Sequence, residues 1–317
     1  MPLPQAPELD IFPLALGANT FGWTSDEAES HEVLDAFVAD GGNLIDTADG
    51  YSAWVPGNTG GESESIIGSW LARSDRPDDL VIASKVSTHP EFKGLSARNV
   101  ASAAEASLSR LGTETIDLYY AHFDDPDNPL GETVEAFGRL VAAGKIRHIG
   151  LSNYSPERVR EWIALSDELG VPRPVALQPR YNLVAREPYE SAYAPLAEEY
   201  GLAVLPYSAL ASGFLTGKYR TAEDFSGVPR RQGVENHFTE DGLAIVAQLR
   251  DIGSRLGEEA STVALAWLRS RPNVAAPIAS ARTISQLAAL LASTRLNLSP
   301  ADLRTLDEVS APDPARN

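Results

Sequence analysis

The sequence of 317 residues contains 26 lysines and arginines against 44 aspartates and glutamates, a formal net charge of −18, and no cysteine. An acidic surface repels the phosphates of nucleic acids and of anionic lipids, so neither a nucleic acid nor a membrane is an expected partner. The absence of cysteine excludes disulfides, zinc–thiolate sites, iron–sulfur clusters and cysteine nucleophiles.

The first residues of the chain, Met1 to Gln5, have neither the basic region nor the apolar run of a signal peptide. No apolar stretch in the sequence reaches the roughly 18 residues that a transmembrane helix needs. We therefore expect a cytoplasmic protein.

Eight short apolar runs follow one another along the chain, separated by polar loops and helix-like stretches. They lie at residues 14–16, 44–45, 80–83, 116–121, 146–151, 175–177, 202–206 and 274–278. Short, nearly continuous apolar runs are typical of parallel strands that are buried on both faces.

The intervening stretches carry helical periodicity and the signals of helix boundaries. Within 100–111 and 134–141 the apolar residues recur on one helical face. Ser155 before Pro156 is typical of a helix start, and Gly144 of a left-handed helix end.

This alternation of strands and helices predicts an α/β fold of the (β/α)8 TIM-barrel type. We expect a single barrel domain over 1–317 with its core at about 10–310. An open, doubly wound sheet is the rival fold, but the Gly-x-Gly-x-x-Gly loop that usually follows its first strand is missing. About 70 residues separate the last two runs. Within them, 209–239 is predicted to form a long loop on the catalytic face, and an extra helix is expected at the C-terminus.

Polar side chains stand where three consecutive strands end. Asp46 ends the second run, Lys85 follows the third and His122 the fourth, while Tyr51 lies in the loop after Asp46. The active site of such a barrel lies at the carboxyl ends of its strands. Each residue alone is commonly structural, as a cap, an ion-pair partner or a satisfied core histidine, but together they indicate a catalytic group.

A tyrosine beside a lysine has a specific chemical use. Free tyrosine, with a pKa near 10, is a poor acid at neutral pH. A nearby ammonium is expected to lower the pKa of Tyr51, and a carboxylate such as Asp46 keeps Lys85 charged and oriented. The phenol can then protonate a developing alkoxide, while His122 orients a carbonyl by a hydrogen bond.

These residues belong to an ordered series of motifs that resembles the aldo-keto reductase superfamily. The matching segments are 43–48 followed by Tyr51, 61–64 with Gly68, Lys85, the His122 segment, 144–153, 178–182 and 215–219. The resemblance covers nearly the whole chain and implies a (β/α)8 barrel that binds NADPH without a Rossmann fold. It also implies that Tyr51 is the general acid, with Lys85 and Asp46 tuning it and His122 orienting the carbonyl.

The resemblance further implies which residues hold the cofactor, with NADH less expected than NADPH. Ser152, Asn153 and Gln178 would hold the nicotinamide carboxamide, Tyr207 would stack on its ring, and Asp46 would approach its ribose. Further cofactor-binding residues are expected in the segment after the seventh run, near the eighth run and just after the first. They are Ser208, Leu210, Ser212, Leu215 and Lys218, then Ser280, Arg282 and Gln286, and finally Asn19 and Thr20.

Two positions near the end of the cofactor site bear on its specificity. Arg282 is suited to the 2′-phosphate of NADPH, although a solvent-facing residue at a helix start is the alternative. Leu290 stands where the family often has asparagine, and it cannot form a hydrogen bond with the adenine.

The substrate pocket would be built from loop residues. Phe21, Trp23, Trp54 and Phe123 are candidates for its walls beside Tyr51 and His122, with ordinary loop packing as the alternative. No metal site is expected, because the five histidines are scattered and no third ligand joins His122 and Asp124.

The sequence therefore predicts an NADPH-dependent oxidoreductase that reduces an aldehyde or ketone, with a small carbonyl compound as its partner. The alternative is a nucleotide-binding module with little turnover, like the channel-associated subunits that resemble this family. Neither the substrate nor the oligomeric state follows from these residues.

Overall fold

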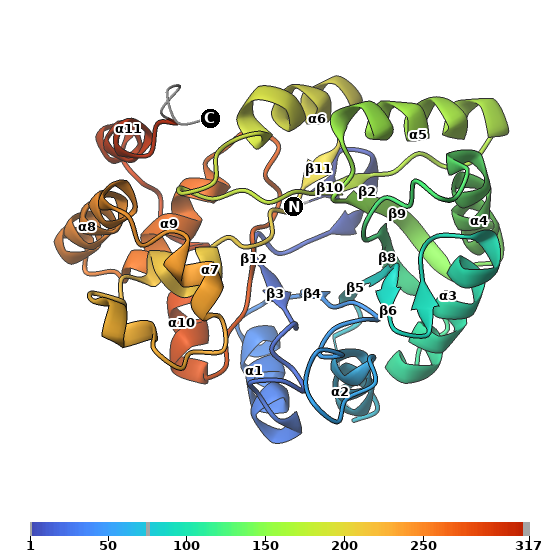
Figure 1. Cartoon of the computed structure of the whole chain (residues 1–317), viewed down its shortest axis with the longest axis horizontal. Coiled ribbons are helices and arrows are strands. Elements are labelled where there is room, and N and C mark those ends of the chain that lie inside the picture. The colour runs from blue at the N-terminus through green and yellow to red at the C-terminus, as the bar shows by residue number, and fades with distance from the viewer. Residues whose placement is uncertain (1, 74–76, 313–317) are drawn as a thin grey trace.

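In the computed structural model, which describes residues 2–73 and 77–312, the eight predicted strands form one parallel sheet (Figure 1). Its order is β11-β10-β9-β8-β5-β4-β3-β12. The strands are β3 (Ala15–Gly17), β4 (Leu44–Asp46), β5 (Val81–Val86), β8 (Ile116–Ala121), β9 (Ile146–Ser152), β10 (Ala176–Gln178), β11 (Ala203–Val204) and β12 (Ile278–Ala279). A parallel bridge joins Val204 of β11 to Val274, just before β12, and the Ile278 amide of β12 donates to the Pro206 carbonyl just after β11. The predicted barrel is therefore confirmed.

Helices surround the barrel, one after each strand, as Figure 1 shows from along the barrel axis. The surrounding helices are α1 (Glu27–Ala39), α2 (Glu62–Leu71), α3 (Ala97–Leu111), α4 (Leu130–Ala142), α5 (Pro156–Leu169), α6 (Ala194–Tyr200), α9 (Ala260–Arg269) and α10 (Ile284–Ala292). The helix-boundary signals are confirmed: Ser155 Oγ accepts from the Arg158 amide, and Gly144 is left-handed with φ of 70°.

A short antiparallel hairpin, which the sequence did not reveal, covers the amino end of the barrel. It consists of β1 (Pro2–Leu3) and β2 (Ala6–Asp10). Leu3 and Leu9 are buried in one cluster with Leu44 and Val81, the first residues of β4 and β5. The hairpin therefore fills the end of the barrel away from Asp46 and Lys85, and leaves the carboxyl end for ligands.

The segment after β11 is more ordered than the long loop predicted for 209–239. It contains the 3₁₀ helices η2 (Ala211–Thr216) and η3 (Ala222–Phe225) and the short helix α7 (Arg231–Glu235), and it leads into α8 (Glu240–Leu256). These turns are too short to produce a periodic apolar pattern, which explains why the sequence suggested only a loop.

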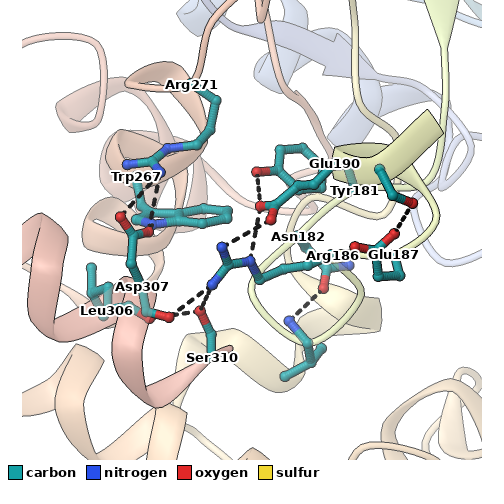
Figure 2. A network of polar contacts seen from close by, with 12 residues as sticks. Tyr181, Asn182, Arg186, Glu187, Glu190, Trp267, Arg271, Leu306, Asp307 and Ser310 are labelled. Carbon is teal, nitrogen blue, oxygen red and sulfur yellow. Dashed lines mark hydrogen bonds and ion pairs between the residues drawn. The ribbon is translucent and has the colours of Figure 1, made fainter. Parts of the chain in front are cut away.

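The expected C-terminal helix is α11 (Pro300–Val309), which packs outside α8 and α9. Figure 2 shows the polar network that fixes it. Arg186, from the loop after β10, binds the Glu190 carboxylate through two donors and reaches the Asp307 carbonyl and the Ser310 hydroxyl of the helix end. The Asp307 carboxylate in turn accepts from Trp267 of α9. The last helix is thus bound to two parts of the barrel wall.

The remaining short elements are the hairpin β6 (Thr88–His89) with β7 (Phe92–Lys93), and the π-helical turn η1 (Tyr189–Tyr193) that precedes α6. The hairpin follows β5 on the same side of the barrel as Lys85.

Helices α2 and α3 approach each other closely at Gly68, where an added Cβ would lie 2.0 Å from the carbonyl oxygen of Arg110. We predict that Gly68→Ala lowers the free energy of unfolding by about 1–3 kcal/mol, because the backbones must move apart. Gly131→Ala in α4 is the matched control, since nothing lies within 4 Å of its Cβ position; it should raise stability by up to about 1 kcal/mol. Equal effects of the two substitutions in urea denaturation would contradict this account of the contact.

Candidate active site

The ammonium of Lys85 lies at the centre of the site. Its Nζ donates to Asp46 Oδ1 at 2.6 Å, to the Thr47 carbonyl at 2.6 Å and to the Tyr51 hydroxyl at 2.9 Å. An ammonium has three N–H donors, so all of them are used. The three residues predicted as the acid and its tuning pair are therefore joined by direct hydrogen bonds.

The register of the barrel explains why these side chains meet. Asp46 is paired with Ala83 across β4 and β5, and Lys85 lies two residues further along β5. Residues two apart in a strand point to the same face, so the side chains of Ala83 and Lys85 both point into the barrel. Lys85 is in turn paired with Tyr120 of β8, and His122 follows that strand directly.

The Lys85–Asp46 pair is buried and ionic. Burial lowers the pKa of Lys85, but the Asp46 carboxylate and the Tyr51 oxygen raise it by more, so its net shift is upward. Burial raises the pKa of Asp46, against the charge of Lys85 and hydrogen bonds from Lys85 and Gln178. Protonated Asp46 would leave a buried ammonium without its counter-ion, which is costly, so both groups stay charged.

The pKa of Tyr51 moves in the direction opposite to the sequence-based expectation. Burial raises it, and the charge and hydrogen bond of Lys85 offset this only in part. The expected net lowering of this pKa is thus wrong, because the sequence shows the neighbouring ammonium but not the burial. The phenol consequently holds its proton at neutral pH, as a proton donor must.

His122 completes this end of the site as a neutral imidazole. Its ring centroid lies 6.0 Å from that of Tyr51. Burial, and after it the charge of Lys85, hold the pKa of His122 well below its usual value. Its Nδ1 is buried and has no hydrogen-bond partner among the described residues.

A chain of hydrogen bonds extends from Asp46 across the barrel mouth. Gln178 Nε2 donates to Asp46 Oδ2 at 2.8 Å, and Ser152 Oγ donates to the Gln178 carbonyl at 2.9 Å. The Asn153 amide donates to Ser152 Oγ at 3.1 Å and accepts from the Tyr207 hydroxyl at 2.8 Å. Polar groups of β9, β10 and the end of β11 are thereby held in one layer beside the catalytic group.

A cavity of about 590 Å³ opens at this end of the barrel and brings the predicted residues together. It is lined by Tyr51 and His122, and by every predicted cofactor residue except Leu215. Leu215 is fully buried in the main core, so its side chain does not reach the cavity.

The far part of the cavity is positively charged and its backbone is unusual. Lys218 and Arg282 line it as predicted. Ser208, Ala211 and Ser212 have positive φ values of 54°, 48° and 58°. Such strained backbone is typical of ligand-binding segments, where left-handed residues turn amide N–H groups toward an anion.

Arg230 is a cavity residue that sequence reasoning missed. It lines the same cavity and donates to Asn19 Oδ1 at 3.1 Å; Asn19 also accepts from Ser280. The available signal was the pair Arg230–Arg231 in the long segment of an otherwise acidic chain. The remaining adenosine-end residue, Gln286, accepts from the Arg282 amide across the start of α10.

The candidate substrate residues differ in their position relative to the cavity. Phe123 lines the cavity, and Trp23 and Trp54 form an edge-to-face pair next to Tyr51. Trp54 is 52% exposed and so lies outside the core, but neither it nor Trp23 is among the residues that line the cavity. Phe21 is fully buried in the main core, so its predicted place in the pocket wall is wrong.

The chain matches the Aldo/keto reductase family over residues 13–311. The chain belongs to this family. Protein tas of Escherichia coli is 34% identical, over 95% of this chain and 94% of its own length. Aldo-keto reductase YhdN of Bacillus subtilis is 31% identical over 96% and 90% of the two chains. A probable voltage-gated potassium channel subunit beta of Arabidopsis thaliana is 32% identical over 88% and 86%.

Aldo/keto reductases are oxidoreductases that act on carbonyl compounds and generally use nicotinamide cofactors, so the family supports the reaction class inferred from the sequence. Among the described residues, no three histidine, aspartate or glutamate side chains are grouped closely enough to hold a metal ion. None of the described helices is long and apolar enough to cross a membrane.

The neutral, partly buried His122 should make stability depend on pH. Because its pKa is lowered in the folded state, the unfolded chain takes up a proton first as the pH falls below about 6.5, and stability is lost from there downward. We predict that His122→Gln reduces the slope of unfolding free energy against pH by up to about 1.4 kcal/mol per pH unit. His237→Gln, at a site where burial also lowers the histidine pKa but less strongly, should reduce the slope less. An unchanged slope in His122→Gln between about pH 5 and 6.5 would contradict this assignment.

Proposed function

We propose that this protein reduces an aldehyde or ketone to the alcohol with NADPH, using Tyr51 as the proton donor. The observation that carries the proposal is the direct bonding of Tyr51 to the buried Lys85–Asp46 pair, beside neutral His122, at one end of a cavity with cations at the other. A small carbonyl compound is the proposed partner, and the proposed location is the cytoplasm.

The cavity fits a dinucleotide phosphate. Ser152, Asn153 and Gln178 would hold the nicotinamide amide, and the ring of Tyr207 would support the nicotinamide, since all four line one wall. The strained segment at Ser208–Ser212 and the ammonium of Lys218 supply amide donors and positive charge for a pyrophosphate. Arg282 would take the 2′-phosphate, which favours NADPH over NADH.

When bound, the reduced nicotinamide would supply a hydride to the carbonyl carbon. The protein's own part is to handle the oxygen. His122, as a neutral imidazole, donates a hydrogen bond that orients the carbonyl. Tyr51 gives its proton to the oxygen as negative charge develops there, and Lys85 stabilises the phenolate that remains. Asp46 holds Lys85 charged and in place throughout.

A second candidate is a nucleotide-binding regulatory module with little turnover. The similarity to a probable channel beta subunit favours it. A panel of aldehydes and ketones, assayed with NADPH and with NADH by loss of the reduced cofactor's absorbance, distinguishes the two. Tight NADPH binding without oxidation by any carbonyl would favour the module.

We predict that Tyr51→Phe lowers kcat by at least about 100-fold, because it removes the proton donor while keeping the ring. The dissociation constant for NADPH, measured by fluorescence titration, should stay within about threefold, since a change of that size is well under 1 kcal/mol. Tyr193→Phe is a suitable control, because that hydroxyl bonds the Tyr154 carbonyl away from the cavity. Full turnover in Tyr51→Phe would refute the proposed role.

Arg282 provides a test of cofactor preference. Arg282→Gln should weaken NADPH binding roughly 10-fold or more and leave NADH binding nearly unchanged, because only NADPH carries the phosphate that pairs with a guanidinium. Lys93→Gln, which removes an equal charge from an exposed hairpin outside the cavity, is the control. A parallel loss for both cofactors would show that Arg282 does not distinguish them.

A further inference from the structure

The segment that follows β8 carries two residues of the site and, directly after them, a carboxylate that binds a neighbouring helix. His122 and Phe123 both line the cavity. Asp124 accepts from Arg158 of α5 through both of its oxygens: Nε donates to Oδ2 at 2.8 Å, and Nη2 donates to Oδ1 at 2.9 Å. The two side chains are only 23% and 25% exposed. A two-point pair of planar groups fixes direction as well as distance, so it can hold a loop in one orientation.

The Arg158 pair is the main polar anchor for Phe123 and Asp124. Over residues 2–73 and 77–312, neither residue forms a hydrogen bond through its backbone. The His122 amide before them is bound to a carbonyl at the end of β5, and the Asp125 amide after them is bound to the Asp124 carboxylate itself. The position of the Phe123 ring therefore depends on where the Asp124 side chain is held.

A second bond ties the same two loops together on the other side of Phe123. Strands β8 and β9 are neighbours in the sheet, and Asn153, directly after β9, donates from Nδ2 to the His122 carbonyl at 2.9 Å. Arg158 lies in the first turn of α5, where Ser155 Oγ accepts from its amide at 3.3 Å. Phe123 thus lies between two residues that are each bound to the β9–α5 unit.

The ring of Phe123 stands beside the reacting groups. It is 45% exposed, and its centroid lies 4.8 Å from that of the His122 imidazole, with 36° between the ring planes. The His122 centroid lies in turn 6.0 Å from that of Tyr51. A shift of Phe123 would therefore move both an apolar wall of the cavity and the ring that packs against His122.

We infer that Arg158 is a positioning residue, which acts through Asp124 to hold the Phe123 ring beside His122 and so determines how tightly a planar apolar carbonyl substrate binds. This inference rests on the proposed reductase function. An aromatic aldehyde offers a flat face to the ring, and that contact requires a ring held in one place. A short aliphatic aldehyde has less apolar surface to bury and depends less on the ring.

The test uses the full-length protein with NADPH and two aldehydes, benzaldehyde and propanal. In Arg158→Gln we expect the ratio of kcat/KM for benzaldehyde to that for propanal to fall roughly 3–10-fold, as loss of one aromatic contact predicts. Most of the change should lie in KM, because the reacting groups are intact. Arg158→Lys, which keeps the charge but not the planar fork, should give a smaller loss.

A double variant examines whether Arg158 acts through Asp124. Asp124→Asn should lower the same ratio, and the variant with both substitutions should lose no more than the worse of the two single variants, because one contact is removed in all three. Losses that multiply in the double variant would overturn the action through Asp124.

Arg160→Gln is the matched control, because it removes an equal charge from the same helix, where Arg160 pairs with Glu199 through exposed side chains. It should leave the ratio of the two aldehydes unchanged. If Arg158→Gln lowers kcat/KM by the same factor for both aldehydes, or changes neither, the positioning role is overturned. Reduction of both aldehydes by the wild type leaves the proposed function standing in that case.

A binding measurement separates the two hypotheses if neither aldehyde is reduced. The protein is labelled with 4-fluorophenylalanine, and the fluorine resonance of Phe123 is assigned from its loss in Phe123→Leu. Benzaldehyde is then titrated in the presence of saturating NADP⁺, and the shift of this resonance gives Kd. Binding that is weaker by at least about threefold in Arg158→Gln, but not in Arg160→Gln, supports the positioning role although the reductase proposal fails. Equal Kd values, or no binding by the wild type, overturn it.

Discussion

The site depends on one buried ion, the ammonium of Lys85. An ammonium in the barrel interior is tolerated only if its charge and all three of its N–H donors are satisfied, and Asp46, the Thr47 carbonyl and Tyr51 do this. The requirement fixes the loop after β4, because Thr47 and Tyr51 must both return to β5. The charge of Lys85 also adds to the effect of burial, which is the larger cause, in holding the pKa of His122 low and its ring neutral.

A second constraint is the contrast between the surface and the cavity. The chain carries a net charge of −18, yet Lys218, Arg230 and Arg282 line one cavity without salt-bridge partners among the described residues. Elsewhere most arginines are neutralised, as in the network of Arg186, Glu190 and Asp307 that holds α11 (Figure 2). Three cations without salt-bridge partners thus gather in one cavity, which suits a polyanionic ligand in an acidic protein.

The sequence was sufficient for the barrel and for the catalytic group, because buried parallel strands produce distinct apolar runs and the polar residues after them must meet at one rim. It was insufficient where side-chain direction or burial decides the outcome. Phe21 lies in a turn, and its side chain is buried in the core. In setting the pKa of Tyr51, burial outweighs the charge of Lys85. Arg230 lies in a segment of short helical turns without periodicity, and the hairpin before Asp10 is too short and proline-rich to form an apolar run.

The state of Lys85 has a consequence for a protein that handles reactive carbonyls. Aldehydes condense with neutral amines to form imines, and they add readily to thiols. The only amine beside the reacting groups is held as a fully hydrogen-bonded ammonium, which has no lone pair to attack a carbonyl. The chain contains no thiol and only four lysines against 22 arginines, whose guanidinium groups stay protonated. An aldehyde beside Tyr51 therefore meets a proton donor, while the adjacent amine of Lys85 has no lone pair with which to attack it.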